Sequence, residues 1–107
     1  MSERRLSYGD RRPYLVPATL AELTGPTSGV VELPNRLDWS EQRRYNLDDP
    51  AELGLMYERV VRESLQVGDL RRYLDGPTLL RVWSRLVLPR RVRALWEERF
   101  PSLRSVA

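Results

Sequence analysis

The sequence contains no cysteine and no histidine, and all 18 of its basic residues are arginine because lysine is absent as well. These absences exclude a cysteine nucleophile, a disulfide, a zinc site of the Cys/His type, a histidine base and a Schiff-base lysine. No apolar run approaches the roughly 18 residues that a membrane helix needs, and residues 1–12 lack the apolar segment of a signal peptide. We therefore expect a cytoplasmic protein without a membrane span, a cofactor or a metal.

With 107 residues and a mass of 12.6 kDa, the chain is long enough for one small domain with a modest core. We expect a flexible basic arm at 1–12, a single compact domain over 13–103 and a loose tail at 104–107. The net charge of +3 is unevenly distributed, because residues 71–107 carry nine arginines against three acids. Such a basic C-terminal third indicates an anionic partner, either nucleic acid or an acidic protein surface, but a solvated arginine-rich surface explains it equally well.

The sequence predicts an α+β fold that is mostly helical. A short helix is expected over residues 17–24, because Pro17 suits a first helical position and Gly25 can end a helix. Alternation of apolar and polar residues over 30–47 predicts a short antiparallel meander, or a hairpin if one of its three segments is a loop. As a strand, the middle segment would place Leu37 and Trp39 on one face.

Three to four helices are expected after this β segment. The clearest begins after Asp49, because a capping Asp, Pro50 at the first helical position and Glu52 three residues after the cap are typical of a helix start. It should run to about residue 65. Shorter helices are predicted at 69–74, capped by Asp69, at 77–86 and at 89–100. The cap accounts for the one dense acidic cluster, Asp48, Asp49 and Glu52, so we expect neither catalysis nor metal binding there.

The last predicted helix has charges that oppose its own dipole. Three arginines lie in its first turn and two glutamates in its last, which costs roughly 0.3–1 kcal/mol per charge. Either the apolar face of the helix tolerates this cost, or the arginines are placed to meet anions. The candidate residues for binding a partner protein or nucleic acid are Arg71, Arg72, Arg81, Arg85, Arg90, Arg91 and Arg93.

The last two predicted helices, joined by a three-residue turn, resemble a helix-turn-helix in outline. The second helix would then present its arginines to phosphates or guanine edges of DNA. An ordinary helical hairpin is the commoner explanation of the same pattern. The sequence shows no P-loop, no dinucleotide-binding turn and no RNA-binding aromatic motif.

Three tryptophans are a large number for a chain of 107 residues. The spacing of Trp83 and Trp96 fits the core faces of helices, and core packing is the commoner use of tryptophan. An exposed tryptophan beside arginines would instead be a protein-interface anchor, because Trp and Arg dominate binding hot spots. Whether Trp39, Trp83 or Trp96 is exposed is left open by the sequence. Ser40, Ser64 and Ser84 have no histidine or lysine to activate them, so an enzyme of carboxylate type is not favoured.

Three stretches of the sequence carry a family resemblance: VPATLAELTGPTSGVVELPNRLDWS, YNLDDPAELGLMYERVVRESL and RRYLDGPTLLRVWSRLVLPRRVRALWEERFPSL. They resemble small actinobacterial proteins encoded beside nucleotidyltransferase-type toxins of the abortive-infection class, over roughly residues 14–103. The resemblance implies an antitoxin-like protein that binds the nucleotidyltransferase and restrains it. The alternative hypothesis is a small DNA-binding transcriptional regulator that uses the helices at 77–100, and both roles can coexist because antitoxins often repress their own operons.

Overall fold

The structure, a computed structural model, describes residues 14–104. Strands β1 (Val30–Glu32) and β2 (Arg44–Asn46) form an antiparallel pair, and the α-helices are α2 (Pro50–Glu63), α3 (Val67–Tyr73), α4 (Gly76–Val82) and α5 (Arg90–Arg99). Three 3₁₀ turns complete the fold: η1 (Leu20–Glu22), η2 (Trp83–Arg85) and η3 (Pro101–Leu103). The predicted α+β class, with a β hairpin followed by helices, is confirmed. The predicted arm at 1–12 lies outside the described residues, as do Pro13 and residues 105–107 of the predicted tail.

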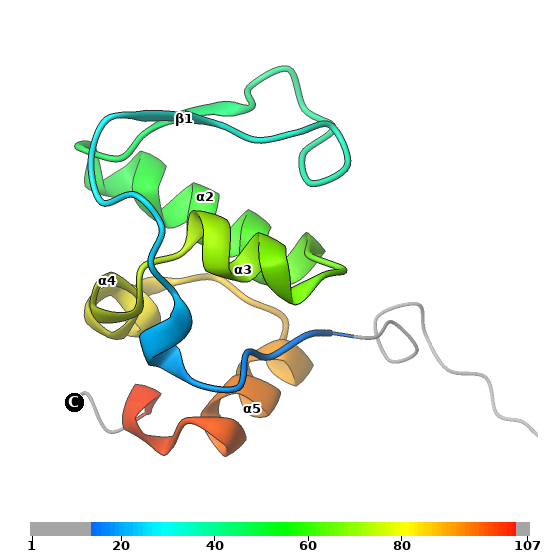
Figure 1. The fold of residues 1–107 in the computed structure, drawn as a ribbon, viewed down its shortest axis with the longest axis vertical. Helices are drawn as coiled ribbons and strands as arrows, with labels where there is room; N and C mark the ends of the chain where they lie inside the picture. The colour runs from blue at the N-terminus through cyan, green and yellow to red at the C-terminus, as the bar shows by residue number, and fades with distance from the viewer. Residues whose placement is uncertain (1–13, 105–107) are drawn as a thin grey trace, which may run out of the picture.

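The β pair lies at one end of the molecule and α5 with η3 at the other, with the remaining helices between them (Figure 1). In the antiparallel register Val31 pairs with Tyr45, and Tyr45 is buried where β2 packs against α2. The segment containing η1 packs against α4. None of the helices in residues 14–104 has both the length and the apolar composition that crossing a membrane requires.

Helix α2 begins as its sequence predicts. Asp49 Oδ1 accepts a hydrogen bond from the Ala51 backbone N–H at 2.9 Å, and Pro50 occupies the first helical position. The carboxylate of Glu52 accepts from the Asn46 backbone N–H at 2.8 Å and so ties the helix to β2. These bonds account structurally for two of the three residues in the predicted acidic cluster.

The core is formed mainly by one face of each helix and by residues that flank the strands. Trp83 and Trp96 are both buried in the core, as their spacing favours, and the centroids of their rings lie 5.8 Å apart. Trp83 donates from Nε1 to Glu97 Oε2 at 2.9 Å. The fully buried apolar side chains include Leu23, Leu33, Leu37, Met56, Tyr57, Val60, Leu70, Leu74, Leu79, Val92, Trp96 and Leu103.

The predicted helix at 17–24 is wrong, because only the 3₁₀ turn η1 forms there. The backbone after η1 pairs instead with the link between α3 and α4: Gly25 N–H donates to Leu74 O at 2.7 Å, and Gly76 N–H donates to Leu23 O at 2.9 Å. A Cβ on Gly25 would lie 2.6 Å from the Tyr73 carbonyl carbon, and a Cβ on Gly76 would lie 2.4 Å from Leu20 O. Glycine at both positions therefore allows the two backbones to meet, and this tertiary pairing overrides the local helical pattern.

The middle segment of the predicted meander is a turn rather than a strand. The N–H groups of Leu37 and Asp38 both donate to Pro34 O, at 2.9 and 3.1 Å, so the backbone curls where a strand would be extended. Without the two-residue period of a strand, Leu37 and Asp38 are both buried while Trp39 is 85% exposed. The predicted placement of Leu37 and Trp39 on one face is therefore wrong.

Helix boundaries after α2 also differ from the prediction. Helix α3 begins at Val67 with Gln66 at its N-cap, and Asp69 is not a cap. The Asp69 carboxylate is buried and accepts both Nη groups of Arg36, at 2.6 and 2.7 Å. This partner is distant in the sequence, so no local pattern indicates it. The helix predicted at 77–86 is capped by Asp75, runs from Gly76 to Val82 and continues as η2.

Candidate functional site

The seven candidate arginines differ in their contacts. Within residues 14–104, the exposed residues Arg81, Arg85, Arg90 and Arg91 have no ion-pair partner. Arg85 lines a recess beside α2, whereas Arg90 and Arg91 line a separate recess on α5. Arg71 forms an ion pair with Glu22 at 2.9 Å, and the Arg72 guanidinium lies 5.9 Å from the centre of the Tyr73 ring. Four cations are thus available to a partner, three of them in these two recesses and the fourth, Arg81, on α4.

Arg93 differs from the other candidate arginines because it makes several contacts within the fold. Its guanidinium donates to the carbonyl oxygens of Trp83 and Leu86 and lies 3.6 Å from the Glu97 carboxylate. It also lies 5.1 Å from the centre of the Trp83 ring. These contacts fix the chain before α5 to the helix itself. They also place a negative charge and two carbonyl oxygens near one of the arginines that oppose the helix dipole.

The link between the last two predicted helices is short, as the sequence predicts, when η2 is counted as the continuation of α4. Helix α4 ends at Val82, and residues 83–89 comprise η2 and an extended link before α5 begins at Arg90. The non-helical link is residues 86–89, one residue longer than the three-residue turn of the predicted helix-turn-helix outline.

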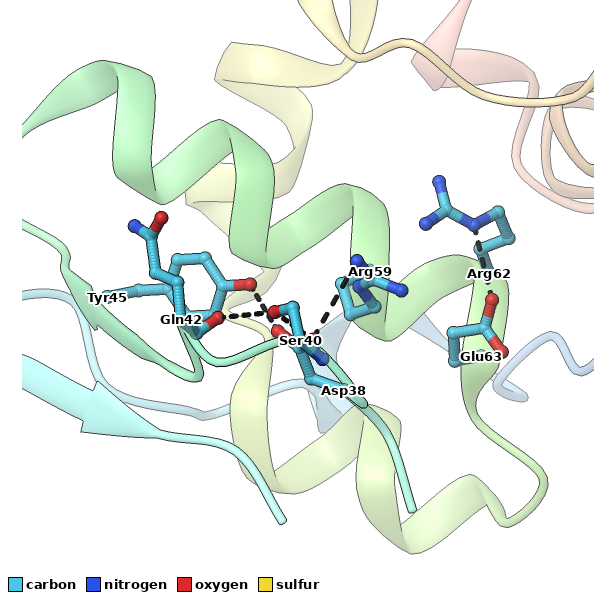
Figure 2. Close-up of polar contacts among 7 residues, drawn as sticks. All are labelled: Asp38, Ser40, Gln42, Tyr45, Arg59, Arg62 and Glu63. Atoms are coloured by element: carbon cyan, nitrogen blue, oxygen red, sulfur yellow. Dashed lines mark hydrogen bonds and ion pairs between the residues drawn. The ribbon is translucent and has the colours of Figure 1, made fainter. Parts of the chain in front are cut away.

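A buried carboxylate organises the loop between the two strands. Asp38 Oδ1 accepts from the Ser40 backbone N–H at 2.9 Å and from Ser40 Oγ at 2.6 Å (Figure 2). Asp38 Oδ2 accepts from the Tyr45 hydroxyl, and Arg59 Nη2 lies 3.7 Å from Oδ1. We call these four residues the Asp38 cluster. The cluster joins the loop, strand β2 and helix α2 through one side chain.

The two acidic groups of the Asp38 cluster titrate far from neutral pH. Burial alone would raise the pKa of Asp38, but the hydrogen bonds from Ser40 and Tyr45 and the charge of Arg59 outweigh it and hold the pKa below its usual 3.8. Burial, together with the hydrogen bond to Asp38, raises the pKa of Tyr45 to about 12. At neutral pH the carboxylate is therefore ionised and the phenol is neutral. Neither group is suited to general acid–base catalysis near pH 7.

The Asp38 cluster holds Trp39 in an outward position. Trp39 is 85% exposed, although both of its chain neighbours, Asp38 and Ser40, are hydrogen-bonded to one another. The bond from the Ser40 N–H to the side chain two residues before it is the Asx turn that favours loops over strands. This Asp-x-Ser signal is present in the sequence, and it could have indicated that Trp39 faces solvent.

A recess lies beside this loop, over the outer face of α2. It has a volume of about 220 Å³ and is lined by Ser40, Gln42, Tyr45, Leu55, Glu58, Arg59 and Arg62. Leu55 is 50% exposed in the middle of α2. Arg62 donates from Nε to Glu63 at 3.3 Å, as Figure 2 shows. An exposed leucine and two arginines thus line one shallow depression, and its lining residue Ser40 directly follows the exposed Trp39 in the chain.

Comparison with protein-family models, curated proteins and solved structures gives no match to this chain. The functional interpretation accordingly depends on the residues and their geometry. Within residues 14–104, no group of three or more Asp and Glu side chains is arranged to hold a metal ion. The feature that distinguishes the described surface is the Trp39 loop with its adjoining recess, and this is the candidate functional site.

Proposed function

We propose that this chain is a non-enzymatic, cytoplasmic protein-binding module, and that it is the antitoxin which binds and restrains a nucleotidyltransferase-type toxin. The observation that carries the binding role is Trp39, an 85% exposed tryptophan on a loop fixed by a buried carboxylate. The identity of the partner is supported by the sequence resemblance over residues 14–103. The absence of histidine, cysteine and lysine from the chain agrees with a role that needs no catalytic residues.

The energetics favour Trp39 as a binding anchor. A tryptophan buries about 150–250 Å², which at about 25 cal/mol per Å² is a gross gain of roughly 4–6 kcal/mol on association. The Asp38 cluster already orders the loop through Ser40 and Tyr45, so less conformational entropy is lost on binding. Trp and Arg are also the residues that dominate binding hot spots, and Arg59 and Arg62 line the adjoining recess.

The exposed arginines supply the electrostatic part of the proposal. A nucleotidyltransferase that holds a metal ion with carboxylates has a negatively charged active site. Arg81, Arg85, Arg90 and Arg91 are the exposed, unpaired candidates within residues 14–104 for complementing that charge. Masking of the toxin's substrate or nucleotide site would follow from such a contact, and opposite charges would also accelerate association.

Co-purification of the tagged chain from its native host, with mass spectrometry of the bound protein, tests the proposed function. A stoichiometric nucleotidyltransferase is the expected partner. Trp39→Ala should weaken its binding by at least tenfold, and Leu65→Ala is the matched control, because Leu65 is 65% exposed just after the end of α2 and does not line the recess. Equal binding by wild type and Trp39→Ala would overturn the role of Trp39, and a purification without a nucleotidyltransferase would overturn its identity as the partner.

DNA binding is the second candidate function. The observation that favours it is the pair Arg90 and Arg91, which are exposed in the first turn of α5. Phosphate contacts release counterions, so binding to duplex DNA should fall steeply with salt and the double variant Arg90→Glu/Arg91→Glu should remove it. Absence of binding to duplex DNA at low salt would eliminate this function without affecting the first.

A further inference from the structure

A second recess continues the candidate site along α2. It has a volume of about 340 Å³ and lies between the outer face of α2 and the end of α4 with η2. Leu55 and Glu58 line both recesses. The residues lining the second recess, which we call the α2 groove, are Pro50, Ala51, Gly54, Leu55, Glu58, Val82, Arg85 and Leu86.

Exposed apolar side chains concentrate along these two recesses. In residues 14–104, five large apolar side chains are at least half exposed. Leu55 lines both recesses, and Trp39 and Val87 are the chain neighbours of the lining residues Ser40 and Leu86. The backbone N–H of Val87 donates to Glu58 Oε2 at 2.8 Å, so Val87 is fixed at the edge of the α2 groove. Exposed apolar groups that cluster rather than scatter indicate an interaction surface.

Gly54 is unexplained by the fold. Glycine in the middle of a helix costs about 1 kcal/mol relative to alanine. Gly54 has no positive φ, and the nearest heavy atom to a Cβ built on it is Leu86 Cδ2 at 4.0 Å, an ordinary contact distance. The backbone and packing therefore accept a side chain at this position. What a side chain would remove is the open space of the α2 groove, in which Gly54 is a lining residue.

The two charged residues that line the α2 groove, Glu58 and Arg85, differ in whether they have a partner. Of its two charged lining residues, Glu58 already accepts from the Val87 N–H. Arg85 is exposed and has no ion-pair partner within residues 14–104. The apolar part of the lining includes Val82 and Leu86, which are almost fully buried and form a firm surface. A complementary ligand therefore has an apolar side chain beside a carboxylate.

We propose that the α2 groove receives a segment of a partner protein in which an apolar side chain adjoins an aspartate or glutamate. The apolar side chain fills the space over Gly54, and the carboxylate pairs with Arg85. This inference rests on the proposed protein-binding function and specifies the chemistry of the partner. It also assigns Gly54 to binding rather than to folding.

A library of random short peptides displayed on phage, panned on the full chain, tests this assignment. Peptides with a leucine or phenylalanine beside an aspartate or glutamate should be enriched. Synthetic versions should lose at least tenfold in affinity with Gly54→Leu and with Arg85→Glu. The matched controls are Gly68→Leu, where nothing lies within 4 Å of a built Cβ, and Arg104→Glu, an exposed arginine outside the groove; both should bind as wild type.

A change in the peptide completes the experiment. Replacing its carboxylate by the amide should weaken binding to wild type by about tenfold but should not weaken binding to Arg85→Gln further, because the pair is then already broken. Circular dichroism establishes that each variant is folded, and Gly54→Ala, which adds only one methyl group, provides a smaller second probe of the same space.

The outcomes separate this inference from the proposed function. Enriched peptides without acidic residues, or peptides whose affinity is unchanged by Gly54→Leu and Arg85→Glu, would overturn the role of the α2 groove. Trp39→Ala could still weaken binding of the nucleotidyltransferase while the groove variants leave that binding unchanged. The proposed function would then stand, and the proposed role of the α2 groove would be wrong. If neither set changed binding, both would fail.

Discussion

At the scale of single residues, Asp38 shows how a buried charge can serve a surface function. Its carboxylate is fully buried, yet three donor atoms and the Arg59 guanidinium surround it. The ionised form is therefore satisfied by hydrogen bonds in the folded state. Because these bonds come from Ser40, two residues further along the chain, and from Tyr45, the charge fixes the conformation of the loop that displays Trp39.

Asp38→Asn should lower the free energy of unfolding by about 1–3 kcal/mol, because it leaves buried donors with a weaker acceptor and Arg59 without its counter-charge. Chemical denaturation measures this difference. Asp48→Asn is the matched control, because Asp48 is exposed and its carboxylate accepts none of the hydrogen bonds found here. Equal stability of the two variants would show that the cluster contributes nothing.

The same residue makes stability depend on pH in the acid range. The pKa of Asp38 lies below its usual 3.8 in the folded chain, so its contribution is present above that value and is lost as the pH falls through the folded-state pKa. Asp38→Asn should therefore flatten the decline of thermal stability below pH 4. An unchanged acid profile would contradict the burial of an ionised Asp38.

Tyr45 gives the complementary effect at alkaline pH. Its pKa is raised to about 12, so its contribution is fully present below the usual value of 10 and is lost as the pH rises through about 12. In Asp38→Asn the phenol no longer faces a carboxylate, and its pKa should move back toward 10. Titration of the Tyr45 ring signals by nuclear magnetic resonance checks this shift, with Tyr45→Phe identifying the signals.

Gly25 and Gly76 illustrate a different constraint on single residues, the close approach of two backbones. Alanine at either position brings a Cβ within 3 Å of backbone atoms, so each substitution should destabilise the chain by about 1–3 kcal/mol or more. Gly68→Ala is the matched control and should be neutral or stabilising by up to about 1 kcal/mol, because its Cβ meets nothing within 4 Å. Thermal denaturation of the three variants distinguishes these effects.

At the scale of elements, helix α5 contains arginines of two kinds. Arg93 stabilises the fold through its contacts, whereas Arg90 and Arg91 have no ion-pair partner within residues 14–104. Arg93→Ala removes donors from two carbonyl oxygens and should cost about 1.5–3 kcal/mol. Arg91→Ala removes an exposed positive charge from the helix start and should instead stabilise by about 0.3–1 kcal/mol. Urea denaturation measures both, and the same sign for the two variants would contradict this division.

Helices were predictable from the sequence where the residues that determine them lie close together in the chain. The cap at Asp49 and Pro50 predicted the start of α2, and helical periodicity predicted the burial of Met56 and Val60. Prediction failed where a distant partner decides the structure. Asp69 binds Arg36 rather than capping a helix, and the residues after η1 pair with the α3–α4 link. The sequence offered Trp39 as a possible anchor, but its exposure depends on the Asp38 cluster, which joins separate elements.

At the scale of the whole molecule, the three tryptophans report on two environments. Trp83 and Trp96 are buried in the core, whereas Trp39 is 85% exposed. Acrylamide should therefore quench one fraction of the fluorescence readily, and Trp39→Phe should remove that fraction and shift the remaining emission to shorter wavelength. Readily quenched emission in Trp39→Phe would show that the core tryptophans are accessible.

The pairing of Thr24 with Asp75 has a consequence for the order of events during synthesis. The backbone around Leu23 and Gly25 finds its hydrogen-bond partners at Leu74 and Gly76, far along the chain. A ribosome makes the earlier segment first, so those groups and the buried Leu23 side chain have no place to dock until the start of α4 has emerged. The nascent chain therefore completes this part of its core late, after α2 and α3 have emerged.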